Sequence, residues 1–335
     1  MNNSTAGNFD TIGYEDCEER IARASTESFQ MSTLGYVIAE ICLVLFLSGT
    51  NILVVIAVAR FQELRTSTNI FVLSLTLSDL MVALVALPLH ITIFLFPSVK
   101  IVFAVCMLRY CVIIVSCGSS IATLMLISVD RYIAIEKPYI YKRVMSKTRS
   151  KILCTAVWTY AMANGSLPLL GLNRWSPCVD CTFTLVLPAP FIAFILGHII
   201  IAVVIIGTLN LKIFLTANAV SREIRQQIAT VNREPTSDKL FLKNKKAAAA
   251  LAMVFGAYAI CNLPFAIFMI WEVYVLNASS SRIKSAPSSF HVFRIGTTFL
   301  SFINSGINPI IYHRRMPEFR RAFRKILRLK PETDS

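Results

Sequence analysis

The sequence predicts an all-α membrane protein, a bundle of seven transmembrane helices followed by a short amphipathic C-terminal helix. Hydrophobic residues make up 55% of the 335 residues and charged residues only 16%, against about 25% charged residues in soluble domains. Seven stretches of roughly 20 residues or more almost lack charge, which is long enough to cross the hydrocarbon layer of a membrane. Most of the 33 lysines and arginines lie between or after these stretches. A water-soluble fold is therefore excluded.

Each apolar segment is expected to be a helix, because lipid offers no partner to an unpaired backbone amide and the segments lack the alternation of barrel strands. Only Glu40 interrupts the first segment and only Asp79 the second. The expected spans are Leu34–Ala59, Thr68–Phe96, Phe103–Ile135, Ile152–Leu172, Leu187–Leu215, Ala247–Val275 and Ile295–Tyr312.

The cations predict the orientation. They concentrate after the first, third and fifth segments and in the tail, so the positive-inside rule puts the C-terminus in the cytosol. We expect residues 1–33 to be extracellular, 34–312 to form the transmembrane domain, and 313–335 to be cytoplasmic. Glycosylation sequons at Asn2, Asn3 and Asn277 then fall on the outer side.

The net charge of +14 does not indicate nucleic-acid binding, because the cations lie between hydrophobic runs and not on one water-exposed face. The polar stretch Thr216–Lys246 is expected to be either mobile or a helical extension of its flanks. In the tail, apolar and basic residues alternate with helical spacing, which predicts a helix lying on anionic membrane lipid. Its apolar face consists of Phe319, Ala322, Phe323, Ile326 and Leu327.

Asp79 is an ionisable residue near the middle of the second segment, where an unpaired charge is costly. Polar residues of other segments lie at a comparable depth if the helices form a bundle. They are Asn51, Ser120, Asn304, Ser305 and Asn308. Carboxylate, hydroxyl and amide oxygens suit a hard monovalent cation. The predicted role is a sodium site, and the alternative is a structural hydrogen-bond network.

Asp130-Arg131-Tyr132 ends the third segment. About 33 Å of helix separates Arg131 from Arg109, so the two arginines should lie at opposite membrane faces. Asp130 is placed to neutralise Arg131 where water is scarce. The alternative is an ordinary arginine that reaches out to the interface.

Two prolines are candidate joints. Asn308-Pro309-Ile310-Ile311-Tyr312 ends the seventh segment, and Pro264 follows Asn262 in the sixth. A proline leaves one helical carbonyl without its donor, and we expect Asn308 to satisfy the carbonyl freed by Pro309. A simple kink is the alternative at either proline.

Four cysteines fall on the predicted outer side, and four cysteines allow three pairings. We expect Cys106 to pair with Cys181, which would fix the third segment to the second outer loop. Cys17 with Cys178 is the accompanying pair, and the other pairings stay open.

Several of these elements occur in a fixed order along the segments. They are Asn51, Leu75 with Asp79, Cys106, Asp130-Arg131-Tyr132, Trp158, Pro264, and Asn308 to Tyr312. Together they resemble the rhodopsin-like (class A) family of G protein-coupled receptors over about Leu34 to Leu329. The resemblance implies a non-enzymatic plasma-membrane receptor with an extracellular small-molecule ligand, heterotrimeric G proteins inside, and arrestin and receptor kinase as further partners.

By the same resemblance, sodium at Asp79 would be an allosteric modulator. Arg131 would face the G protein when the sixth segment swings outward, and Tyr139 would touch the G-protein surface. Asn262, Tyr258, Ala202 and Asn210 replace the family's usual switch residues, and Asn244 stands where an acid would hold Arg131. We therefore expect appreciable basal signalling.

Parts of the sequence are similar to adenosine receptors. The similar stretches are Asn210–Leu215, Leu167–Gly171, Cys181-Thr182-Phe183 and Glu40. Met269, Ala266 and Phe302 stand where those receptors have an asparagine and two histidines. These departures argue against adenosine recognition.

The ligand pocket is expected in the outer half of the bundle. One candidate is Ile113, and the others are Phe183, Ile114, Cys117, Met269 and Thr298, for which packing is the alternative role. Ile113 stands where amine receptors have an aspartate, and the seventh segment has no lysine for retinal. Arg109, His90, Glu272 and Arg294 either bind a polar or anionic ligand or pair with each other, Glu272 with Arg294 first.

A transporter or channel with a cation site at Asp79 is the alternative function. Such a protein should show paired helix breaks or a polar stripe along a pore, and neither is apparent. A membrane enzyme would need a catalytic pair at depth, whereas no second acid accompanies Asp79.

Overall fold

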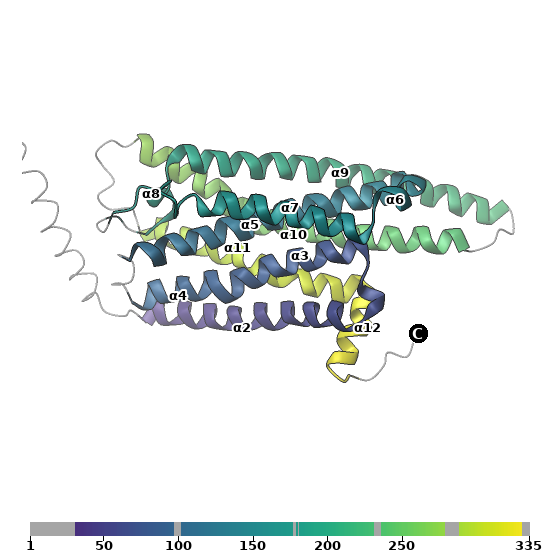
Figure 1. Cartoon of the computed structure of the whole chain (residues 1–335), viewed down its shortest axis with the longest axis horizontal. Helices are drawn as coiled ribbons and strands as arrows, with labels where there is room; N and C mark the ends of the chain where they lie inside the picture. Colours follow the sequence, from purple (N-terminus) through teal and green to yellow (C-terminus); the bar gives the residue numbers. More distant parts are fainter. Residues whose placement is uncertain are drawn as a thin grey trace, which may run out of the picture.

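The computed structural model describes residues 31–96, 102–176, 179, 181–230, 236–278 and 288–329. Every regular element in these ranges is helical. Figure 1 shows long helices packed lengthwise into one bundle, with α12 lying across one end. We call this the α12 end, and we call the opposite end, which contains a disulfide bond, the disulfide end. The predicted all-α bundle is confirmed.

The first crossing is α2, Met31–Arg60, followed by the short 3-10 helix η1, Gln62–Leu64. The second crossing is not one uniform helix. It consists of α3, Ser67–Met81, a π-helical turn η2, Val82–Ala86, and α4, Leu87–Leu95. The hydroxyl of Thr66 caps α3 by accepting a hydrogen bond from the Asn69 amide at 3.2 Å.

Helix α5, Phe103–Glu136, is the central helix and packs on α3, α7, α9 and α10. The short α6, Pro138–Val144, follows it. Helix α7, Lys147–Ser166, begins earlier than expected, because Ser146 caps it by accepting from the Arg149 amide at 3.3 Å. The expected helical end at Leu172 is wrong. Pro168 has no N–H to continue the ladder, and Gly171 lies in the left-handed region at φ 110°.

The remaining elements are α8, Phe183–Val186, α9, Ala189–Thr230, α10, Thr236–Ala278, α11, Ser288–Arg315, and α12, Pro317–Ile326. Helices α9 and α10 run beyond the rest of the bundle at the α12 end (Figure 1). Of the two expectations for Thr216–Lys246, the helical extension of the flanks is the one observed in the described residues 216–230 and 236–246. Helix α11 continues three residues past the predicted boundary at Tyr312.

Five stretches of the described helices are long and apolar enough to cross a membrane. They are Leu34–Arg60, Ser67–Leu95, Phe103–Glu136, Ala189–Ala219 and Ala252–Tyr274. Helices α7 and α11 are long enough but more polar. Helix α7 begins with lysine and arginine, and α11 carries Asn304, Ser305 and Asn308, which are buried inside the bundle.

Two apolar clusters hold the ends of the bundle. At the α12 end, Phe71, Leu124 and Tyr312 pack with Phe319 and Phe323 of α12. This burial confirms the predicted apolar face of α12 except at Leu327, which lies beyond the helix and is exposed. At the disulfide end, the second cluster forms around Cys106 and Cys181.

Candidate functional site

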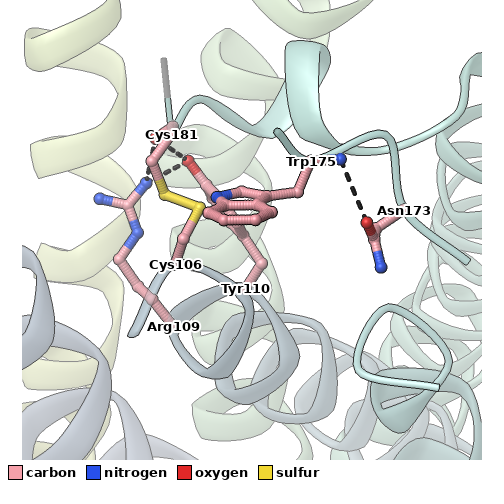
Figure 2. Close-up of a disulfide and its surroundings, with 6 residues drawn as sticks. All are labelled: Cys106, Arg109, Tyr110, Asn173, Trp175 and Cys181. Atoms are coloured by element: carbon pink, nitrogen blue, oxygen red, sulfur yellow. Dashed lines mark hydrogen bonds between the residues drawn. A yellow bond between two sulfur atoms is a disulfide. The ribbon is translucent and has the colours of Figure 1, made fainter. Parts of the chain in front are cut away.

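The disulfide bond joins the start of α5 to the segment before α8. Cys106 and Cys181 are bonded with their Cα atoms 5.9 Å apart, which confirms the expected pair. The Cys181 carbonyl accepts hydrogen bonds from the Tyr110 hydroxyl at 2.7 Å and from a terminal nitrogen of Arg109 at 3.1 Å. Figure 2 shows both side chains reaching from α5 to this carbonyl. Helix α5 therefore fixes the loop above the cavity.

A cavity of about 890 Å³ lies beneath this disulfide. Its volume is within the range of small-molecule sites. All nine predicted pocket residues line it: Arg109, Ile113, Ile114, Cys117, Phe183, Met269, Glu272, Arg294 and Thr298. The structure thus brings the complete predicted set together around one cavity. Trp175 packs edge-on against Phe103 beside the disulfide, with ring centroids 5.3 Å apart (Figure 2 shows Trp175).

Charged residues gather at the end of the cavity nearest the disulfide. The Arg294 guanidinium lies 3.9 Å from the Glu272 carboxylate, which confirms the expected pair. His90 Nδ1 lies 2.7 Å from Glu40 Oε1, a contact that the sequence analysis did not foresee. The Phe302 ring contacts the His90 ring, with 6.0 Å between their centroids. The sequence contains one indication of the contact between His90 and Glu40, which is that both are ionisable residues within apolar segments.

Asp79 is buried at the centre of the bundle. Asn308 Nδ2 of α11 donates a hydrogen bond to its carboxylate at 2.8 Å. The hydroxyls of Ser78 and Ser119 lie 2.7 Å apart, which puts the neighbouring Ser120 of α5 at the same level. Several buried oxygen atoms of this region have no hydrogen-bond partner within the described residues. They are Asn51 Oδ1, Ser120 Oγ, Asn304 Oδ1 and Asn308 Oδ1.

The prediction that Asn308 satisfies the carbonyl freed by Pro309 is wrong. That carbonyl belongs to Ser305, and it accepts from Asn51 Nδ2 of α2 at 3.0 Å. The Asn308 amide donates to Asp79. The break in α11 is thus repaired by a different helix, which ties α2 to α11 at this point.

The second proline, Pro264, lies within α10. Asn262 Nδ2 donates to the Tyr258 carbonyl at 3.0 Å, one turn earlier in the same helix. The Ser301 hydroxyl of α11 donates to the Cys261 carbonyl at 3.3 Å. Hydrogen bonds from side chains therefore support the backbone of α10 on the N-terminal side of this proline.

Arg131 lies at the α12 end within a buried polar network. Its Nε donates to Asp130 Oδ2 at 2.9 Å. The same carboxylate accepts from the Thr68 hydroxyl of α3 at 2.8 Å and from the Tyr141 hydroxyl of α6 at 3.1 Å. Arg131 also donates to the Thr68 hydroxyl. The network confirms that Asp130 pairs with Arg131, and it adds two partners from other helices.

Thr68 and Tyr141 were missed by the sequence analysis. Burial of the Tyr141 phenol, with the Asp130 carboxylate beside it, raises the pKa of that phenol, so it stays protonated and donates at neutral pH. The signal that could have identified Tyr141 is Pro138, which starts a helix that turns back under α5. Tyr132 packs against Ile135 and Ile213 on another side of α5.

Tyr139 occupies the surface of the same short helix. Its side chain is 94% exposed, so it is available to a partner. Asn2, Asn3, Cys17 and Cys178 lie outside the described residues. Asn244 and Asn277 belong to α10, but their side chains are outside the described part.

Comparison with known proteins identifies the family. Residues 50–312 match the family described as 7 transmembrane receptor (rhodopsin family). The chain is 31% identical to the dog adenosine receptor A2a over 319 residues, which cover 89% of this chain and 74% of that protein. It is 28% identical to the chicken adenosine receptor A2b, over 87% of this chain and 88% of that protein. The chain therefore belongs to the rhodopsin family of seven-transmembrane receptors, as a multi-pass protein of the plasma membrane and not an enzyme.

Proposed function

We propose that this receptor binds an extracellular ligand in the cavity at the disulfide end and activates cytosolic heterotrimeric G proteins at the α12 end. The observation that carries this proposal is the buried network around Arg131. It lies on the same helix, α5, that lines the cavity through Ile113, Ile114 and Cys117. The N-terminus would then be extracellular and the C-terminus cytoplasmic, as the distribution of cations favours.

The coupling would work through two states of one bundle. In the closed state, Asp130, Thr68 and Tyr141 occupy the hydrogen-bonding groups of Arg131. Opening at the α12 end would release Arg131 toward the G protein, together with the exposed Tyr139. The breaks at Pro264 and Pro309 are the points where α10 and α11 can bend. Arrestin and a receptor kinase are proposed as later partners on family likeness.

A sodium ion fits the site around Asp79 by the chemistry of its donors. The site combines one carboxylate with the hydroxyls of Ser120 and Ser305 and the amide oxygens of Asn304 and Asn308. Several of these oxygens are buried without a hydrogen-bond partner in the described residues. Hard oxygen ligands of this kind are the ones that small cations prefer. The ion would compensate the buried carboxylate and link α3, α5 and α11.

The alternative function, a transporter or channel with a cation site at Asp79, is not supported, because the family match is to receptors. Guanine-nucleotide exchange on purified G proteins, with membranes that contain this chain, tests the proposed function. The full chain should accelerate exchange over empty membranes, and Arg131→Ala at matched surface expression should not. Equal exchange by the two proteins would contradict the role of Arg131.

Basal signalling is expected without added ligand, because Asn244 stands where the family has an acid that restrains Arg131. A reporter cell expressing the full chain should signal above an empty-vector control, several-fold at matched surface expression, as small biases between two states produce. A reporter signal equal to that of the empty vector would argue that the network of Asp130, Thr68 and Tyr141 is restraint enough.

Sodium should lower this basal exchange. By bringing α3, α5 and α11 together around Asp79, the ion would stabilise the closed state. Couplings of this kind typically change an equilibrium constant about 5–150-fold. The measurement is basal nucleotide exchange in sodium chloride against potassium chloride at equal ionic strength. Asp79→Asn should abolish the difference, whereas Glu63→Gln, at an exposed acid on η1, should preserve it. An unchanged sodium effect in Asp79→Asn would place the ion elsewhere.

A further inference from the structure

We propose that the ligand is an anionic amphiphile with one long hydrocarbon chain, which enters the cavity from the bilayer between α7 and α9 and places its acid group on Arg109. This inference rests on the proposed function, since it names the ligand class of the same cavity. Three observations lead to it: the apolar length of the cavity, its opening on the lipid side, and the state of Arg109.

The cavity is long and almost entirely apolar. From Arg109 it follows α5 down to Met125, sixteen residues later, which is about 24 Å along the helix axis. Its deep part is lined by hydrocarbon side chains, Ile121, Ala122, Met125, Leu153 and Val157. One leaflet of a bilayer is about 15 Å thick, so a lipid-length chain fits along this path. A purine would leave most of it empty.

The cavity also opens sideways. Helices α7 and α9 both pack on α5, but they make few contacts with each other. Residues that line the cavity here are also exposed on the outside of the bundle: Tyr160 at 50%, Phe194 at 44% and Ile201 at 62%. In a membrane this surface faces lipid, so the opening admits hydrocarbon chains directly.

One polar contact bridges this opening. The Tyr160 hydroxyl of α7 lies 2.8 Å from His198 Nε2 of α9, and the Phe194 ring lies 4.2 Å from the His198 ring between centroids. Both Tyr160 and His198 line the cavity. The contact is a single hydrogen bond between exposed side chains, so a hydrocarbon chain that enters has only this hydrogen bond to displace.

Arg109 supplies the charge that an acid group needs. It lines the cavity and is only 6% exposed. All of its hydrogen bonds within the described residues run from one terminal nitrogen, to the Cys181 carbonyl and the Tyr110 hydroxyl. Its Nε is buried without a partner. Figure 2 shows the other terminal nitrogen directed away from the disulfide.

The nearby carboxylates already have partners. Glu272 lies beside Arg294 and Glu40 beside His90. Among the described residues, Arg109 therefore forms no ion pair, although its side chain is buried. A buried cation of this kind is stabilised by an anion with matching hydrogen-bond acceptors. A carboxylate and a phosphate are both suitable, so the acid could come from a fatty acid or from a lysophospholipid.

Direct binding to the full chain in phosphatidylcholine nanodiscs tests the proposal. The probes are oleate and oleoyl lysophosphatidate, with oleyl alcohol as the chain without charge and acetate as the charge without chain. At least one of the two acids should bind about tenfold or more tightly than oleyl alcohol, and acetate should not bind measurably. The acid that binds more tightly shows whether the ligand is a fatty acid or a lysophospholipid. Equal binding of the alcohol and both acids, or no binding of either acid, would overturn the proposal.

Variants of Arg109 locate the acid end of the ligand. Arg109→Gln should weaken binding of the acid about tenfold or more and leave the affinity for oleyl alcohol unchanged. Arg109→Lys should restore part of the lost affinity. Binding of oleyl alcohol and the midpoint of thermal unfolding, measured for each variant, show whether the cavity stays folded. If Arg109→Gln binds the acid as the unmodified chain does, Arg109 is not the anchor and the proposal fails.

The lateral path has its own matched pair. Ala156→Phe puts a ring into the exposed opening on α7, whereas Ala193→Phe adds the same ring to an exposed position of α9 that does not line the cavity. The first should slow acid binding about tenfold, and the second should not. Equal rates of acid binding in both variants would refute entry from the bilayer.

Acid binding without nucleotide exchange would support the ligand class while contradicting the proposed G-protein function.

Discussion

Asp130→Ala is expected to lower the stability of the receptor by about 3–5 kcal/mol, the usual cost of removing one partner from a buried ion pair. The Asp130 carboxylate is completely buried and accepts hydrogen bonds from Arg131, Thr68 and Tyr141. Its loss removes the carboxylate that pairs with the Arg131 guanidinium. The measurement is the midpoint of thermal unfolding of the purified receptor, together with its amount at the cell surface.

The same change should raise basal nucleotide exchange per receptor at the surface, because Arg131 loses its main restraint. Tyr141→Phe is the matched control, since it removes one hydrogen bond of the same carboxylate and keeps the ring. It should cost about 1 kcal/mol and raise basal exchange less. If Asp130→Ala is as stable as Tyr141→Phe, the ion pair contributes little and the network is not a restraint.

Gly165→Leu should prevent the receptor from reaching the cell surface. Gly165 lets α7 approach α5 closely, as small residues do in many membrane-helix interfaces. A Cβ atom there would lie 2.3 Å from Val115 Cγ2 and 3.1 Å from the Cys111 carbonyl oxygen. Because the backbone of α5 cannot yield as a flexible side chain would, α7 must move away, and the lining of the cavity that α7 supplies moves with it.

Surface labelling and ligand-independent thermal unfolding measure this effect. Gly197→Leu provides the comparison, because a Cβ at Gly197 of α9 meets nothing within 4 Å. Both substitutions add the same side chain to a membrane helix, so intrinsic helix preference cancels. Normal surface levels of Gly165→Leu would show that α5 and α7 can separate at no cost.

Much of the fold followed from the sequence because the bilayer restricts the possible structures so strongly. Length and apolarity identify a crossing whatever its neighbours are, and the charges between crossings separate one from the next. The residues that line the cavity could also be predicted, since the resemblance implied their depth and the direction in which they face. The ends of helices were harder, as Leu172 shows, because a few turn residues decide them.

Side-chain partners across helices were the part that could not be predicted. Asn51 and Asn308 have the same donors and similar depth, and only the packed bundle decides which one reaches the Ser305 carbonyl and which one Asp79. Tyr141 likewise reaches Asp130 because α6 turns back beneath α5. Such pairings depend on rotations between helices, which a one-dimensional pattern does not contain.

The π-helical turn Val82–Ala86 gives the second crossing an unusual sensitivity to its length. A π turn accommodates one residue more than an α turn, so everything after it is rotated by about 100° relative to an uninterrupted helix. His90 meets Glu40 only in that rotated phase. A relative that lacked one residue between 82 and 86 would turn its own histidine away from the acid, even with every other side chain identical. Insertions and deletions in this short stretch therefore act as substitutions throughout α4.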